Sequence, residues 1–476
     1  MKTISRSLQL IGASSFVLLA GPVLASGYNF GTQSASNQGV ANAGAAGLTD
    51  ASVLFYNPAG MTRVEGTQIS GVLNYIMPDG NFSNSGTVNA IGQPISGNNG
   101  GSFGVDTLVP HLYMTSQLND KWTIGAGLFV PFGSHTDYDK GWVGRYNSTE
   151  SELKTINFNP SVAYKINDMF SIGGGVSVQY IQGKLSKNLD LGLSAVNGAN
   201  AAVKKICAAA PTSPQCKGGA AAVKNAAGTM VSNPTYDGSS EVTGDDVAFG
   251  FNLGATVNFS PTTRMGVAYR SAISHTLEGD AKFTVPQNFA SSALGALLGG
   301  GAQATLNSQL KNTSANLSVD TPESFSINGF HQINEQWAIM ADYTWTRHSR
   351  LDEIRVKLAN GLPDSVTVTN WTNTNRYSVG ATYQASDKWL IRTGMAYDQA
   401  PENDSNRITS IPDSDRIWFA LGANYAITPN QSIDLTAIYV DLANSKVSQK
   451  DQNGSIAKGN YDVSSITLGA QYNYRF

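Results

Sequence analysis

The side chains that could perform chemistry are few and widely spaced. One Gly-x-Ser-x-Gly match, residues 100–104 around Ser102, has the letters of a serine nucleophile elbow, but it closes a Gly/Asn-rich loop without the strand-turn-helix setting. The histidines are scattered along the chain: His111, His135, His275, His331 and His348. The sequence therefore disfavours a hydrolase and predicts a protein that is not an enzyme and uses no metal or other cofactor.

The two cysteines could form a covalent bond. Cys207 and Cys216 lie nine residues apart in one Ala/Gly-rich segment. In an exported chain this spacing favours a disulfide, with two free thiols as the alternative. The histidines do not cluster with them at zinc-site spacing, so no metal site can be built.

The N-terminus predicts that the chain is exported. Lys2 and Arg6 precede a largely apolar run from Leu8 to Ala20, and small residues follow up to Ala25. This order is typical of a secretory signal peptide, because the apolar run is too short to span a bilayer. We expect residues 1–25 to be removed, with a buried N-terminal helix as the alternative.

The composition fits neither a helical membrane protein nor an ordinary soluble enzyme. Past residue 26 no stretch approaches the ~20 consecutive apolar residues of a transmembrane helix. Charged residues make up 14% of the 476, against about a quarter in soluble domains, while Gly, Tyr and Phe number 49, 19 and 18. A net charge of -3 suggests no nucleic-acid partner. Strands whose outer face meets lipid would account for these proportions.

A recurring polar turn, followed by alternating apolar residues, predicts the strands. After Trp122, Ile124, Ala126 and Leu128 alternate with small or polar residues, which is the period of a strand with one apolar face. Such turns occur at 119–122, 167–170, 260–263, 334–337, 386–389 and 428–431. Long polar connections occur at 79–101, 134–151, 186–245, 276–319, 349–374, 399–412 and 443–460.

The number of these connections gives the number of strands. Six short turns and seven long loops join 14 strands, and an even number is what a closed antiparallel bacterial barrel requires. From Ile466 the chain is apolar at every second position up to the aromatic carboxy-terminus, Phe476. We therefore predict an all-β fold, a 14-stranded antiparallel transmembrane β-barrel over residues 66–476. We expect the barrel to lie in outer-membrane lipid as a monomer.

Three segments fall outside the strand pattern. Residues 26–65 are rich in Gly and small polar residues, and a plug (hatch) inside the lumen fits them best. The loop at 186–245 holds Ala-rich pieces that favour helix. The loop at 276–319 holds Phe289 and an apolar helical face. The residues of that face are Leu294, Leu297 and Leu298. These two loops are expected to capture a hydrophobic ligand, unless they only pack together as a lid.

Over essentially the whole mature chain the sequence resembles the FadL family of outer-membrane long-chain fatty acid transporters. The motifs that carry this resemblance are Asn57-Pro58-Ala59, Thr321-Pro322-Glu323, Gln336-Trp337-Ala338-Ile339, Arg392-Thr393-Gly394-Met395-Ala396 and Ile411-Pro412-Asp413-Ser414-Asp415-Arg416. The resemblance implies a hatch, a ligand groove between the third and fourth outer loops, a second pocket deeper inside, and a kinked third strand that opens the barrel sideways.

The resemblance also implies roles for particular residues. The kink would fall at Pro131-Phe132-Gly133, and Asn57-Pro58-Ala59 would hold the hatch. Tyr28 would reach towards the deep pocket, and Lys187 would meet a carboxylate. A second basic residue is expected after Trp345, but Asp352 and Glu353 occupy that neighbourhood.

The sequence thus predicts passive transport of long-chain fatty acids towards the periplasm. Uptake of other hydrophobic compounds, such as monoaromatic hydrocarbons, is the alternative within the same fold. An outer-membrane hydrolase would need catalytic residues at the mouth, and an adhesin or purely structural barrel would leave the 40-residue plug unexplained.

Overall fold

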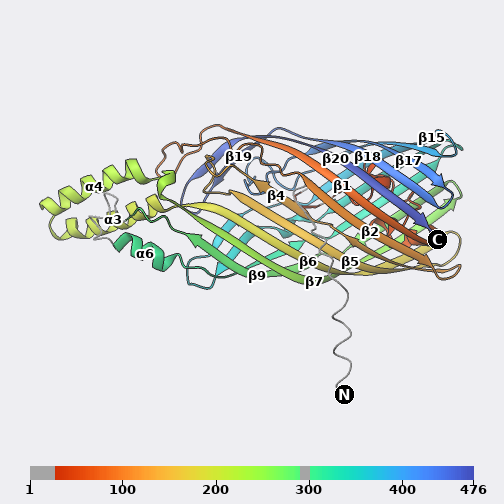
Figure 1. Ribbon diagram of the computed structural model, residues 1–476, viewed down its shortest axis with the longest axis horizontal. Helices are drawn as coiled ribbons and strands as arrows, with labels where there is room; N and C mark the ends of the chain where they lie inside the picture. The colour runs from red at the N-terminus through yellow and green to blue at the C-terminus, as the bar shows by residue number, and fades with distance from the viewer. Residues whose placement is uncertain (1–26, 30, 290–300) are drawn as a thin grey trace, which may run out of the picture.

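The computed structural model describes residues 27–29, 31–289 and 301–476, and these residues form one closed sheet of antiparallel strands. The last strand, β20 (Ile456–Arg475), pairs with the first, β1 (Thr67–Asn84), along the whole of β1 from Gln68 onwards. This pairing leaves the sheet without an edge (Figure 1). The segment expected as a signal peptide, 1–25, lies outside the described residues. In the part of the chain that is described, no helix is long and apolar enough to cross a membrane.

The sheet consists of 20 segments that make 14 barrel strands, because six of the strands are interrupted. The uninterrupted strands are β1, β2 (Thr107–Gln117), β5 (Glu150–Lys165), β6 (Phe170–Asp190), β7 (Asp237–Ser260), β16 (Trp389–Asp398), β17 (Arg416–Thr428) and β20. The interrupted strands are β3 (Trp122–Phe129) with β4 (Gly133–Asp137), β8 (Thr263–Arg270) with β9 (Ile273–Thr284), β10 (Thr313–Thr321) with β11 (Ser324–Gln332), β12 (Trp337–Thr346) with β13 (Glu353–Leu358), β14 (Ser365–Val368) with β15 (Thr374–Gln384), and β18 (Gln431–Leu442) with β19 (Ser445–Lys450). The predicted 14-stranded antiparallel barrel is confirmed, and each of the six polar turns joins two consecutive strands.

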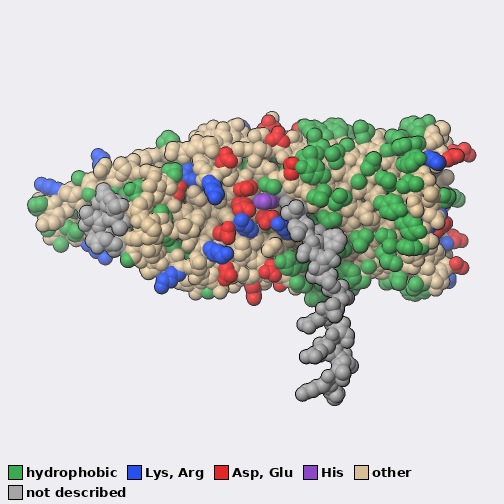
Figure 2. Space-filling view, in the orientation of Figure 1, with side chains coloured by type: hydrophobic (Ala, Val, Ile, Leu, Met, Phe, Trp, Pro, Cys, Tyr) green, Lys and Arg blue, Asp and Glu red, His purple; other side chains and the backbone are tan. Residues whose placement is uncertain are grey.

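Apolar side chains cover the outside of one half of the barrel. Leu128, Phe249 and Leu421 are examples that point away from the lumen and are 44%, 69% and 64% exposed. Figure 2 shows that such side chains gather over the half that carries the C-terminus in Figure 1, and that charged side chains are frequent beyond this band. About 9–11 residues suffice to cross a bilayer, whereas β7 has 24. The strands therefore continue well past the membrane on the side opposite the short turns.

The long strands extend into segments that the sequence predicts as loops. β6 continues to Asp190 and β7 begins at Asp237, although 186–245 is predicted as one connection. Beyond the apolar band both faces of a strand meet water or a polar lumen, so the alternation that marks a strand in the sequence disappears.

Helices cap the extracellular end of the barrel. α3 (Leu191–Ala209) and α4 (Pro214–Met230) form an antiparallel hairpin beside α6 (Gly301–Gln309), at the end of the molecule opposite the C-terminus (Figure 1). Two short 3₁₀ turns lie elsewhere along the chain, η2 (Pro234–Tyr236) between α4 and β7 and η3 (His348–Arg350) between β12 and β13. The helical cap has an apolar core of its own, in which Leu193 and Met230 pack near Phe289.

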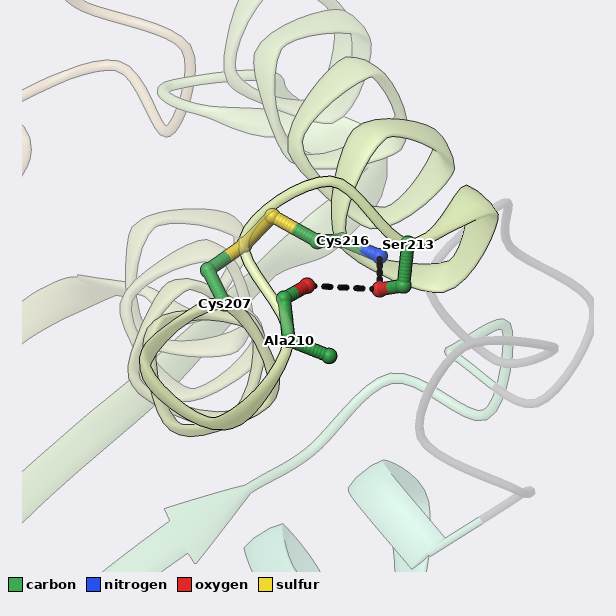
Figure 3. Close-up of a disulfide and its surroundings, with 4 residues drawn as sticks. All are labelled: Cys207, Ala210, Ser213 and Cys216. Carbon is green, nitrogen blue, oxygen red and sulfur yellow. Dashed lines mark hydrogen bonds between the residues drawn. A yellow bond between two sulfur atoms is a disulfide. The ribbon is translucent and has the colours of Figure 1, made fainter.

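A disulfide between Cys207 and Cys216 joins the last turn of α3 to the first turn of α4 (Figure 3). The hydroxyl of Ser213 accepts a hydrogen bond from the Cys216 amide at 3.1 Å and donates one to the Ala210 carbonyl at 2.8 Å. The connection between the two helices is therefore held by both a covalent bond and an N-cap.

The segment before the barrel lies inside it. We call residues 31–65 the hatch; it contains α1 (Ala35–Gln38), α2 (Val53–Tyr56) and η1 (Pro58–Arg63). Leu54 and Met61 are fully buried in one cluster with Tyr113 and Phe129 of the barrel wall. Polar contacts reach the wall as well, because the Gln38 side-chain amide donates to Asn74 Oδ1 at 3.0 Å. Both apolar and polar contacts thus hold the hatch inside the lumen.

Candidate ligand path through the barrel

An upper cavity of about 530 Å³ lies at the extracellular end of the lumen. Its apolar lining includes Leu185, Leu189, Val242, Phe283, Leu310, Ile354, Val356, Leu358 and Leu362. Among the described residues that line it, Lys187 is basic and Glu150 is acidic, and Glu150 pairs with Lys184 at 2.6 Å; polar residues complete the lining. A cavity of this size and composition suits a small hydrophobic molecule with one charged group.

Lys187 has a neutral partner in this cavity. Its Nζ donates to the hydroxyl of Ser365 at 3.1 Å, and no carboxylate of the described residues lies within ion-pair distance. Because Lys187 lies at the end of β6, beyond the apolar band, it sits outside the membrane. Burial lowers the pKa of Lys187, and the more distant carboxylate of Asp451 partly opposes that effect. A half-enclosed ammonium group without an anion is suited to receive one from a ligand.

Other basic residues near the mouth already have acidic partners. Arg347 and Arg350 both pair with Glu323, and Arg355 pairs with Glu353 and with Asp364. Of the acidic residues that follow Trp345, Glu353 and Asp364 thus engage Arg355, and none of these three arginines lines the upper cavity.

The remaining residues expected to bind ligand are placed elsewhere. Phe289 is fully buried in the core of the helical cap, 5.4 Å from the ring of Tyr236, and it does not line the upper cavity. Leu294, Leu297 and Leu298 lie outside the described residues. The structure therefore does not bring Phe289 and Lys187 to one site.

Tyr28 belongs to an aromatic cluster beside the interrupted third strand. Its ring stacks on Trp371 at 5.7 Å and contacts Phe132 and His348 at 5.8 and 6.0 Å. Its hydroxyl donates to the backbone carbonyl of Asp320. Tyr28 does not line the upper cavity, but its contacts fix the start of the described chain against the wall.

The wall is interrupted between Phe129 and Gly133, where β3 ends and β4 begins. The break contains Pro131, which cannot donate to a strand ladder. The ladder between β2 and β3 ends at Leu112 and Leu128, and beyond it the Val130 amide donates to the ring of His111 at 3.3 Å. The sequence expects the kink at Pro131-Phe132-Gly133, and Gly133 is the first residue of β4.

The first described residues, 27–29 and 31–33, which we call the N-terminal segment, cover this gap from inside. The amide of Gly133 donates to the Tyr28 carbonyl at 2.9 Å, and the Gln33 side-chain amide donates to the Val130 carbonyl at 2.7 Å. Asn29 forms an isolated bridge with Phe132. Movement of the N-terminal segment would therefore uncover the break in the wall.

The Asn57-Pro58-Ala59 turn fastens the hatch to the wall. The Asn57 amide group donates to the carbonyls of Ala255 on β7 and Val267 on β8, both at 3.1 Å, and Asn57 Oδ1 accepts from the Ala59 amide. Close approach requires glycine on the wall, because a Cβ at Gly254 would lie 2.1 Å from Asn57 Oδ1.

A lower cavity of about 90 Å³ lies where these parts meet. It is lined by Pro131 and Phe132 of the break, by Phe55 and Pro58 of the hatch, and by Arg270 of the wall. The lower cavity thus adjoins the break in the wall, the hatch and β8.

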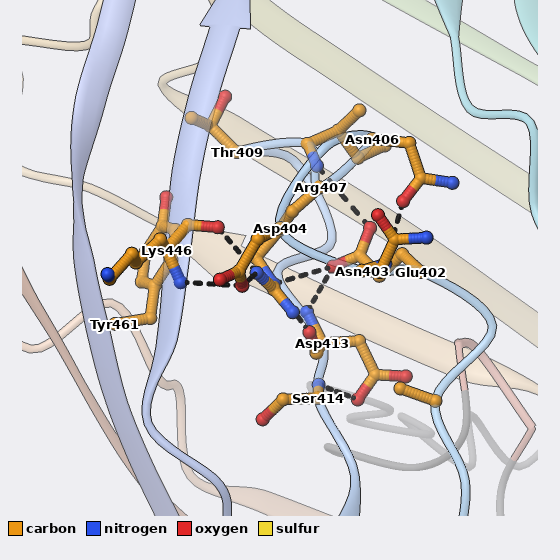
Figure 4. A network of polar contacts seen from close by, with 12 residues as sticks. Glu402, Asn403, Asp404, Asn406, Arg407, Thr409, Asp413, Ser414, Lys446 and Tyr461 are labelled. Atoms are coloured by element: carbon orange, nitrogen blue, oxygen red, sulfur yellow. Dashed lines mark hydrogen bonds and ion pairs between the residues drawn. The ribbon is translucent and has the colours of Figure 1, made fainter.

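The loop between β16 and β17 holds the start of the described chain. Asp413 Oδ2 accepts a hydrogen bond from the Gly27 amide at 2.7 Å. Arg407 supports this loop by donating to the Asp413 carbonyl and pairing with Asp404, while Glu402 accepts from the Asp413 amide (Figure 4). Sequence reasoning assigned no role to Asp413, although the motif at 411–416 marks its position.

A closed 14-stranded barrel with an apolar outer band, a filled lumen and an apolar cavity above it defines an outer-membrane β-barrel that passes hydrophobic compounds. Residues 16–476 match the family model described as outer membrane protein transport protein (OMPP1/FadL/TodX). The chain belongs to this family, whose members are outer-membrane transporters and channels for hydrophobic compounds.

Individual relatives cover almost the whole chain. A putative outer membrane protein of Neisseria meningitidis serogroup B is 34% identical over 471 residues, 96% of each chain. A long-chain fatty acid transport protein of Escherichia coli O6:H1 is 27% identical and covers 98% of this chain and 97% of its own. The crystal structure of a Pseudomonas aeruginosa FadL homologue has a TM-score of 0.80 at 26% identity, covering 94% of this chain and 100% of that one.

Proposed function

We propose that the chain carries long-chain fatty acids across the outer membrane towards the periplasm. The observation that carries this proposal is the upper cavity, where apolar residues lie beside Lys187, which has no carboxylate within ion-pair distance among the described residues; Glu150 of the same lining pairs with Lys184. An alkyl chain gains ~0.8 kcal/mol per methylene on leaving water, and the lysine accounts for an acidic head group. The similarity to a long-chain fatty acid transport protein supports the same ligand class.

The proposed path runs from the helical cap to the break in the wall. A fatty acid enters the upper cavity with its carboxylate at Lys187. The aromatic cluster around Tyr28 packs against Ile354 of this cavity and includes Phe132 of the break. Release of the N-terminal segment opens the break between β3 and β4, and the alkyl chain can then leave sideways into apolar surroundings. The transfer is passive, because burial of the alkyl chain supplies its free energy.

The test compares two ligand classes in a strain that lacks its own fatty acid and hydrocarbon channels. We expect expression of this chain to raise uptake of radiolabelled oleate well above that of toluene. A barrel-folded variant with the cavity filled, Val242→Trp, is expected to lose oleate uptake. Toluene uptake without oleate uptake would overturn the fatty acid proposal in favour of a monoaromatic hydrocarbon channel.

A further inference from the structure

Three arginines differ from the others in the described chain. The others have acidic partners; Arg376, Arg392 and Arg416, for example, each pair with an aspartate inside the barrel. Arg63, Arg264 and Arg270 form no ion pair with any carboxylate of the described residues. A guanidinium that is enclosed without an anion is costly, so these three positions require an explanation.

All three unpaired arginines donate to backbone carbonyls of the hatch. Arg270 Nη2 donates to the Phe55 carbonyl at 2.9 Å, Arg264 Nε donates to the Ala46 carbonyl at 2.7 Å, and Arg63 Nη2 donates to the Leu48 carbonyl at 3.0 Å. Neutral carbonyls satisfy a guanidinium less well than a carboxylate, which can accept two parallel hydrogen bonds. The bonds of Arg264 and Arg270, which lie on β8, therefore also fasten the hatch to the wall, whereas the bond of Arg63 joins two parts of the hatch itself.

Aromatic faces complete the surroundings of two of these arginines. The Arg270 guanidinium lies 4.6 Å from the ring centroid of Phe55, and that of Arg264 lies 4.1 Å from the centroid of Phe330. Such contacts stabilise a cation while leaving its N–H groups available to an anion.

The three arginines are arranged along one side of the lumen. Arg264 and Arg270 are six residues apart on β8, about 20 Å at the rise of an antiparallel strand, and both face inwards. Arg270 lines the lower cavity, and Arg264 lies nearer the periplasmic turn. Burial and the positive charge of Arg264 lower the pKa of Arg63 to about 9. The buried Nε and Nη1 of Arg63 have no hydrogen-bond partner among the described residues.

We propose that Arg270, Arg264 and Arg63 form an anion-binding track in which the ligand's carboxylate, received first at Arg270, replaces the hatch carbonyls and releases the hatch. The track rests on the proposed function, because its ligand is the acid that Lys187 admits. A carboxylate at Arg270 takes over the donor that holds the Phe55 carbonyl, two residues before the turn that begins at Asn57. An uncharged hydrocarbon cannot make this exchange, so it would leave the hatch closed.

A single cysteine introduced into the hatch can report the release of the hatch. Ser36→Cys is nearly isosteric at a side chain that is 2% exposed, and both native cysteines are joined in the disulfide. In lipid nanodiscs, oleate should increase the rate of maleimide labelling of Ser36→Cys by about tenfold or more, whereas methyl oleate should not.

Variants of Arg270 separate charge from structure. Arg270→Gln should abolish the oleate-dependent increase in labelling, and Arg270→Lys should retain most of it. Arg347→Gln is the matched control, since Arg347 is half exposed and its partner Glu323 keeps Arg350. Heat-modifiable migration in gels checks that each barrel is folded.

The outcomes distinguish this inference from the proposed function. Oleate that binds to Arg270→Gln and still accelerates labelling as in the parent would overturn the arginine track alone. Equal acceleration by methyl oleate in the parent would also overturn it, because release would not depend on charge. Failure of the parent to bind oleate would overturn the track together with the proposed function.

Discussion

Replacing Lys187 removes the cation that the described residues contribute to the upper cavity and should leave the barrel folded. Lys187→Met keeps the apolar length of the side chain, and the Ser365 hydroxyl that loses its donor can be satisfied by water. A charge-assisted hydrogen bond contributes about 1.5–3 kcal/mol, and each 1.4 kcal/mol is a factor of ten. We therefore expect the dissociation constant for oleate to rise by roughly ten- to a hundred-fold, and that for methyl oleate to change little.

The assay for this change is titration of nanodisc-embedded protein with each ligand, because detergent would compete for an apolar cavity. Lys140→Met, at an exposed lysine of the extracellular loops, serves as the matched control. Equal loss of affinity for acid and ester would show that Lys187 shapes the cavity without binding charge. Unchanged affinity for both would refute the head-group role, and Arg347, Arg355 and Lys357 would then be the residues to replace.

Three further predictions follow from contacts described above. Replacing Asn57 and Pro58 together with alanine removes two hydrogen bonds to the wall, so the barrel should insert normally while oleate uptake falls; uptake equal to the parent at equal surface expression would contradict the role of the turn. Replacing Cys207 and Cys216 with serine should speed hydrogen exchange in α3 and α4 but leave the melting temperature of the barrel unchanged, whereas a barrel that fails to fold would contradict it. Burial and the carboxylate of Asp413 raise the pKa of Glu402, and burial raises the pKa of Asp413, so ionisation of this loop costs stability that is regained as the pH falls towards the raised pKa values. Glu402→Gln should accordingly raise the melting temperature most at alkaline pH, and this advantage should shrink as the pH falls; an advantage that grows as the pH falls would show the opposite sign.

The strands were predictable because the membrane imposes a simple pattern on them. Each short turn has a polar sequence, and the strands beside it must place an apolar residue outwards at every second position. This is why the turns at 119–122 and 334–337 lie between consecutive strands as predicted. Past the apolar band no such constraint exists, and the extracellular ends of β6 and β7 were therefore expected as loop.

The contacts inside the lumen could not be predicted in the same way. Gly27 and Asp413 are 386 residues apart, and only the closed barrel brings them together. Arg264 and Arg270 donate to carbonyls of a hatch whose sequence has no regular period. Lys187 could be singled out because it follows a predicted strand. The position of Phe289 could not be predicted, because packing of the helices turns it into the cap core and away from the upper cavity.

The disulfide near the tip of the α3–α4 hairpin has a practical consequence. Ala210 and Pro211, inside the covalent loop, are exposed at the end of the molecule furthest from the C-terminus (Figure 1). Exposed loop tips with small residues are the sites that best tolerate inserted sequence. A foreign peptide placed between these two residues would begin and end inside a loop closed by one sulfur–sulfur bond, away from the bilayer. The hairpin therefore offers a mount for displaying epitopes or affinity tags on living cells.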